Sequence, residues 1–119
     1  GFGLTHTLPL LVGQQNATMM MYTGRRIKGE EAVQMGLADV LVPLDQVRSA
    51  AMDLAKEIAI SSPLGVVETR ATMRAGLADR VRAATDHELT IQNQLRVTED
   101  FQEGIKAASE RRDPNFMGR

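Results

Sequence analysis

Apolar residues recur at helical spacing along most of the chain. The clearest stripe lies within residues 45–60, where charged side chains fall off the apolar positions. This spacing places the apolar side chains on one face of an α-helix. Asp45 is a suitable N-cap for this helix, and Ser62 and Pro63 follow its end. The stripe consists of Val47, Ala50, Ala51, Leu54, Ala55 and Ile58.

Two short helices are expected before this one, over residues 5–12 and 16–23. Thr5 and Asn16 are polar residues of the kind that cap helix N-termini, and Gly13 separates the two segments.

Three helices are expected after it. Ser62 as N-cap and Pro63 at the first helical position begin one, and Thr98 caps the last. Between them, residues 77–97 form a long helix with one apolar face. Glu88 is interpreted as part of that helix's solvent-facing side.

Residues 24–43, which lie between the first two expected helices and the helix within residues 45–60, contain the one strand that the sequence predicts. Glu30 and Glu31 suit the first turn of a short helix, where negative charge is favourable, and Gly36 suits its left-handed end. Residues 40–42 form a short apolar run with β-branched side chains, which predicts a buried strand ended by Pro43. The expected fold is therefore mostly α with one short strand.

Composition narrows the classes of function. The 119 residues carry 14 basic and 15 acidic side chains, so no general attraction to nucleic acid or to an anionic membrane is expected. There is no cysteine, which excludes a disulfide framework and cysteine-based metal sites. No apolar run reaches the roughly 18 residues that a membrane span needs. We expect no metal site, no nucleic-acid partner and no membrane partner.

Candidate catalytic residues are few when the residues are taken alone. His6 and His87 are far apart and have no metal-ligand spacing, so a ligand or general-base role is the weaker interpretation beside an ordinary surface or supporting histidine. Glu30 and Glu31 are adjacent and would point about 100° apart on a helix, so they make a poor acid–base pair.

Three blocks of the chain resemble the crotonase (enoyl-CoA hydratase/isomerase) superfamily. Residues 23–43, TGRRIKGEEAVQMGLADVLVP, are similar to the family's T-G-x-x-I-x-A-x-E-A-x-x-x-G-L-V-x-x-V-V-P. Residues 1–13, GFGLTHTLPLLVG, are similar to G-A-G-G-T-Q-R-L-P-R-L-V-G. Residues 98–119 are similar to the closing T-E-D-x-x-E-G-x-x-A-F-x-E-K-R-x-P-x-F-x-G-R. The blocks occur in the family's order.

The resemblance implies a fold and an assembly. The chain corresponds to the C-terminal part of an α/β crotonase-like spiral fold. Residues 1–43 would end the spiral core, and residues 44–119 would form the C-terminal helical oligomerisation region. Family members form trimers, often paired into hexamers, so a homotrimer or hexamer is expected.

The resemblance also implies an activity on acyl-CoA thioesters, with CoA as part of the substrate and no separate cofactor. Two backbone N–H groups hold the thioester oxygen as an enolate forms. In hydratases two glutamates handle the water that adds across the C2=C3 bond. These donors and glutamates precede the matched region. Gly1 falls where hydratases have glycine beside the catalytic water, which favours hydration.

Binding residues carried over from the family lie at both ends of the chain. Phe2 and Leu4 replace smaller residues in a loop beside the acyl group, so they are candidate substrate contacts. Arg111 falls on the family's basic CoA-binding position, and Ala108 replaces its aromatic partner. A dipole-complementing surface role for Arg111 is the alternative. Phe116 is interpreted as a packing anchor.

Other interpretations stay open. Within the family they are isomerase, hydrolase, carbon–carbon lyase and dehalogenase-like chemistry. Outside catalysis, the apolar stripes also fit a helical module that only oligomerises. The expected compartment is the cytoplasm, with the mitochondrial matrix as the alternative.

Overall fold

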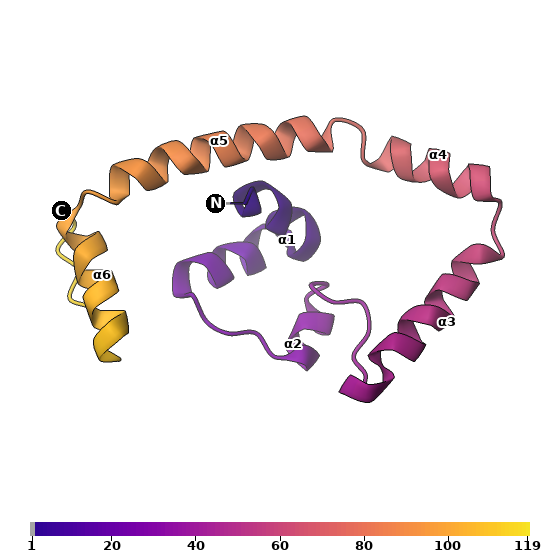
Figure 1. The fold of residues 1–119 in the computed structure, drawn as a ribbon, viewed down its shortest axis with the longest axis horizontal. Helices are drawn as coiled ribbons and strands as arrows, with labels where there is room; N and C mark the ends of the chain where they lie inside the picture. The colour runs from indigo at the N-terminus through magenta and orange to yellow at the C-terminus, as the bar shows by residue number, and fades with distance from the viewer. Residues whose placement is uncertain (1) are drawn as a thin grey trace.

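The computed structural model describes residues 2–119, and this part of the chain contains six α-helices and one short 3-10 helix (Figure 1). The expectation of a mostly helical fold is confirmed. The elements in chain order are α1 (Leu4–Thr23), α2 (Gly29–Gln34), η1 (Leu44–Gln46), α3 (Val47–Ala59), α4 (Pro63–Met73), α5 (Leu77–Leu95) and α6 (Glu99–Glu110).

Helix α1 is two helical segments that meet at a kink. Gly13 has φ 77° and ψ 160°, outside the helical region, so the predicted break between two short helices is confirmed. The predicted caps are wrong. Gly3 is the N-cap of the first segment instead of Thr5. The Asn16 side chain donates to the Val12 carbonyl at 3.0 Å, so it does not cap the second segment.

The predicted strand over residues 40–42 is wrong. No strand occurs within residues 2–119, and the segment between α2 and η1 runs without a paired neighbour. A strand exists only where another strand completes its backbone hydrogen bonds, and apolar β-branched composition alone cannot supply that partner. Leu41 instead lies against Gly29, and Val40 is largely exposed.

Several predicted helix ends are confirmed by geometry. The Ser62 side chain accepts from the Gly65 backbone N–H at 3.4 Å, and the Thr98 hydroxyl accepts from the Phe101 N–H at 3.2 Å. Gly36, with φ 80°, follows α2. Asp45 does not cap α3, because it lies inside η1, which leads directly into that helix.

The helices form an arch rather than a closed bundle. In Figure 1, α3, α4 and α5 follow one another around α1 and α2, and α6 turns back beneath the far end of α5. The extents are 56 × 35 × 22 Å and the Cα radius of gyration is 19.3 Å. A compact domain of this length would have a radius of gyration of about 13.5 Å. The chain therefore encloses little interior of its own.

The apolar stripes are helical as predicted, but they are not buried within this chain. The buried apolar side chains of the described residues come from α1 and α6 alone. On α3, Val47, Leu54 and Ile58 remain about half exposed. Apolar area of this extent indicates surfaces that need a partner. The buried residues are Leu8, Val12, Ala17 and Ala107.

Candidate functional site

Of the N-terminal candidates, Phe2 lies in a strained turn before α1 and Leu4 is the first residue of that helix. Gly1 lies outside the described residues. Phe2 has φ 101° and Gly3 has φ 72°, two consecutive residues in the left-handed half of backbone space. This region is costly for a side-chain-bearing residue such as Phe2. The Phe2 side chain is 91% exposed, so its own packing does not hold it there. Leu4 is about half exposed.

A glutamate from the middle of α5 holds this turn. The Glu88 carboxylate accepts the Gly3 N–H at 2.9 Å through Oε2, and the Thr5 N–H at 3.0 Å through Oε1. Oε1 also accepts the Thr5 hydroxyl at 2.6 Å. The interpretation of Glu88 as a solvent-facing residue is therefore wrong. Helical periodicity reports the face of α5 on which a residue lies, and it contains no information about what packs over that face.

The contacts with Thr5 and Gly3 favour the ionised form of Glu88. The Thr5 hydroxyl has the largest effect, followed by the Thr5 backbone N–H, and together with Gly3 they outweigh partial burial. The pKa of Glu88 is consequently lowered from its usual value. A carboxylate at the start of α1 also interacts favourably with the helix dipole.

The C-terminal candidate, Arg111, is presented at the end of α6. It occupies the C-cap position with φ 55° and ψ 41°, a left-handed conformation more usual for glycine. Its backbone N–H donates to the Ala108 carbonyl at 3.4 Å. The residue is exposed, and within residues 2–119 its guanidinium makes no hydrogen bond or ion pair.

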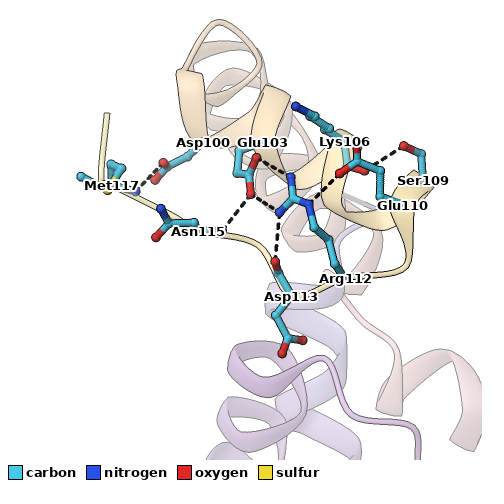
Figure 2. Close-up of polar contacts among 9 residues, drawn as sticks. All are labelled: Asp100, Glu103, Lys106, Ser109, Glu110, Arg112, Asp113, Asn115 and Met117. Carbon is cyan, nitrogen blue, oxygen red and sulfur yellow. Dashed lines mark hydrogen bonds and ion pairs between the residues drawn. The ribbon is translucent and has the colours of Figure 1, made fainter.

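The neighbouring arginine is fully engaged instead (Figure 2). Arg112 binds both carboxylate oxygens of Glu103, at 2.6 and 2.9 Å, and donates to Glu110 at 2.6 Å. It also donates to the Asp113 carbonyl at 3.0 Å. A planar guanidinium suits this forked arrangement. The two adjacent arginines thus differ. Arg112 binds the acidic side chains at the end of α6, whereas the Arg111 guanidinium has no partner within residues 2–119 and can bind a ligand.

The chain beyond α6 folds back along that helix. The Asp100 carboxylate accepts the backbone N–H groups of Met117 at 2.7 Å and Gly118 at 2.8 Å. Glu103 accepts the Asn115 N–H at 2.8 Å (Figure 2). The residues that make these contacts line an open groove of about 530 Å³. The Phe116 ring lies near Gly104 but remains more than half exposed, so its interpretation as a packing anchor stays a prediction.

The charged contacts at the end of α6 shift two pKa values. The hydrogen bond from Arg112, and next the Asn115 N–H, lower the pKa of Glu103 to about 2. Glu103 in turn has the largest effect on Arg112, whose pKa is raised. The pair is therefore ionised throughout the physiological range.

The structure does not bring the N-terminal and C-terminal candidates together. Four grooves on the described surface, of 400 to 730 Å³, have no lining from Phe2, Leu4 or Arg111. Within residues 2–119 no group of three histidine and acidic side chains is placed to hold a metal. In the same part of the chain, no helix is both long and apolar enough to cross a bilayer.

Of the two histidines, for which a catalytic role is the weaker interpretation, His6 has the unusual environment. Its Nε2 atom is enclosed and has no hydrogen-bond partner in the described part of the chain. Such atoms are uncommon in folded proteins. His87 is exposed on α5.

Comparison with known proteins identifies the family. The family model for enoyl-CoA hydratase/isomerase matches residues 1–119. A 2,3-dehydroadipyl-CoA hydratase from Escherichia coli is 33% identical over 119 residues, which cover 100% of this chain and 47% of that protein. An (E)-benzylidenesuccinyl-CoA hydratase from Thauera aromatica is 34% identical over 118 residues, covering 99% and 46%. The chain thus spans about half the length of these relatives.

The fold agrees with the sequence match. A crystal structure of an enoyl-CoA hydratase/isomerase from Pseudoalteromonas atlantica superposes with a TM-score of 0.81 at 27% identity, over 97% of this chain and 46% of that one. An enoyl-CoA hydratase from Bacillus anthracis is 31% identical, with a TM-score of 0.59, over 98% and 45%. The arch of helices is the C-terminal helical part of the crotonase fold, and the chain belongs to the enoyl-CoA hydratase/isomerase family.

Proposed function

We propose that this chain is the C-terminal half of an enzyme that hydrates the C2=C3 bond of 2-enoyl-CoA thioesters. The reaction passes through an enolate whose oxygen is stabilised by two backbone N–H groups. Those donors, and the carboxylates that move the proton and activate water, belong to the other half of the enzyme. No cofactor is required, because CoA is carried by the substrate.

The observation that carries this proposal is the match to hydratases along the whole chain. The relatives from Escherichia coli and Thauera aromatica are both named as CoA-thioester hydratases, at 33% and 34% identity. A glycine at position 1, where the family's hydratases have one, supports hydration.

This half contributes binding groups rather than proton-transfer groups. Phe2, in the turn before α1, and Leu4, at the start of that helix, lie beside the acyl group in this proposal. Arg111 binds a CoA phosphate with its unengaged guanidinium, which can make charge-assisted hydrogen bonds. Residues 1–43 end the spiral core, and residues 44–119 form the oligomerisation region.

The exposed apolar faces support an oligomer, and we propose a homotrimer or a hexamer. Exposed apolar residues occur on α3, α4 and α5 in succession, including Ile58, Leu64 and Leu89. Such area is stabilised when another subunit, or the preceding half of the enzyme, covers it. The same surfaces support the alternative of a helical module that only oligomerises. Within catalysis, isomerase, hydrolase and lyase chemistry are the alternatives.

The compartment of the enzyme is proposed to be the cytoplasm, with the mitochondrial matrix as the alternative. The names of two relatives, from Arabidopsis thaliana and Pyricularia oryzae, include the word mitochondrial.

The test is to obtain the complete enzyme and measure hydration of crotonyl-CoA, following loss of the conjugated thioester by ultraviolet absorbance and identifying the 3-hydroxyacyl product. The 119-residue chain alone is the control, and we expect it to be inactive because it lacks the oxyanion donors. A double-bond shift or free CoA as the product would reassign the reaction within the family. No turnover of any acyl-CoA, together with a defined oligomer, would favour the non-catalytic module.

A further inference from the structure

We propose that Glu88 is a positioning residue that fixes the turn formed by Phe2 and Gly3, and thereby sets which acyl chains the enzyme accepts. The inference rests on the proposed function, which places this turn beside the acyl group. Glu88 itself touches the backbone of the turn and is not assigned any contact with substrate.

The geometry joins two distant parts of the chain through one side chain. The contacts of Glu88 with Thr5 and Gly3 span 83 and 85 residues of sequence. Both carboxylate oxygens are used, and the three donors are two backbone N–H groups and one hydroxyl. A carboxylate held at both oxygens fixes the orientation of the peptide groups as well as their position. Figure 1 shows the N-terminal end of α1 directly below the middle of α5.

No local residue performs this function. The N-cap residue of α1 is Gly3, which has no side chain, and the first turn contains no acidic residue. The first N–H groups of a helix have no partner inside it, and a capping side chain usually satisfies them. The Thr7 hydroxyl donates to the Gly3 carbonyl and leaves the N–H groups to Glu88.

The turn is strained, which is why an external anchor matters. Phe2 and Gly3 both have positive φ, and Phe2 is almost fully exposed. A non-glycine residue stays in this region only where its surroundings determine it. Those surroundings are the Glu88 contact and the packing of Gly3 against α5, where an added Cβ would lie 2.9 Å from the Val81 side chain and 3.2 Å from the Thr85 hydroxyl.

A purely stabilising cap and a positioning residue make different predictions. Loss of a stabilising cap lowers the amount of folded enzyme and so reduces turnover of every substrate by one factor. Loss of a positioning residue moves Phe2, and it changes the ratio of kcat/KM between short and long acyl chains. Acyl-chain preference therefore separates the two roles.

The experiment uses the complete enzyme with Glu88→Gln, and with Thr5→Val as a second variant that removes one donor. Asp86→Asn is the matched control, because Asp86 is an exposed acidic residue of α5 whose carboxylate makes no hydrogen bond within the described residues. Hydrogen exchange of the residue 3 and 5 amides reports the anchor. The ratio of kcat/KM for crotonyl-CoA and 2-decenoyl-CoA reports the preference.

We expect amide exchange about tenfold faster in Glu88→Gln, because a charge-assisted hydrogen bond is lost. The kcat/KM ratio should change about fivefold, which is the effect expected of a substrate contact that is displaced but not removed. Asp86→Asn should change neither readout, and Thr5→Ser, which keeps the hydroxyl, should restore both relative to Thr5→Val.

Equal loss of kcat/KM for both substrates, or unchanged exchange at residues 3 and 5, would overturn the inference. If Glu88→Gln does not fold, the comparison of Thr5→Val with Thr5→Ser decides by the same two readouts. If the wild-type enzyme hydrates neither substrate, the proposed function fails and the acyl role fails with it. The exchange measurement then still decides whether Glu88 anchors the turn.

Discussion

Glu88 and Thr5 are joined by two hydrogen bonds to one carboxylate oxygen, at 2.6 Å from the hydroxyl and 3.0 Å from the backbone N–H. They lie 83 residues apart in the sequence. We expect Thr5→Val and Glu88→Gln to be coupled in a double-mutant cycle by about 1 kcal/mol. This is below the usual value for a bond to a charged group, because the site is partly exposed.

The cycle is measured by urea unfolding of the complete enzyme with each single and the double variant. Additive effects of Thr5→Val and Glu88→Gln would show that the two side chains act independently, contrary to the geometry.

Substitution of Gly3 should lower the free energy of unfolding more than substitution of a comparable glycine. Gly3→Ala combines φ +72° with a Cβ only 2.9 Å from the Val81 side chain. Gly24→Ala is the matched control, with φ +61° and no atom within 4 Å of the added Cβ. The unfavourable backbone conformation costs about 1–2 kcal/mol in each variant. The clash should add about 1–2 kcal/mol for Gly3 alone.

Thermal unfolding followed by circular dichroism compares these two glycine variants. Equal destabilisation of Gly3→Ala and Gly24→Ala would mean that Val81 moves aside without cost.

Arg111→Ala should weaken binding of CoA to the complete enzyme about five- to tenfold, because an exposed charge-assisted contact is worth less than a buried one. Arg96→Ala is the control, since Arg96 is likewise an exposed C-cap arginine without an ion pair in the described residues. Calorimetric titration with CoA gives both dissociation constants. The difference should shrink as salt is added, because screening weakens phosphate contacts. An unchanged constant for Arg111→Ala would return this residue to a surface role.

The fold-back of the chain beyond α6 should depend on pH. The pKa of Glu103 is about 2 against an ordinary 4.5, so the folded state favours the ionised form. Its contribution to stability is therefore complete above pH 4.5 and is lost as the pH falls toward 2. Protection of the Asn115 and Met117 amides, measured by NMR across this range relative to their intrinsic exchange rates at each pH, should fall in step.

In Glu103→Gln the same amides should exchange faster at neutral pH and lose most of the acid dependence. Glu68→Gln, at an exposed α4 residue without a hydrogen bond within the described part of the chain, should leave the profile unchanged. A profile in Glu103→Gln identical to that of the wild type would show that another group, such as Asp100, controls the fold-back.

The sequence by itself determined the helices, some of their ends and the family. Ser62, Thr98 and Gly36 act locally, through hydrogen bonds and backbone conformations that involve residues a few positions away. The position of each stripe on its helix also follows from spacing alone. Local rules therefore suffice for these features, and the same local patterns carry the resemblance to the family.

Only the tertiary structure decided which residues and segments contact one another. Residues 40–42 have the composition of a strand, yet no strand pairs with them within residues 2–119. Glu88 has the periodicity of a solvent-facing residue and instead anchors the turn before α1. Arg111 and Arg112 are adjacent and alike, but within residues 2–119 Glu103 and Glu110 of α6 bind Arg112 and not Arg111. Strand pairing and capping across long distances depend on neighbours that are remote in sequence, and spacing along one helix contains no information about them. The choice between the two arginines depends instead on the backbone conformation at the end of α6, where Arg111 is left-handed.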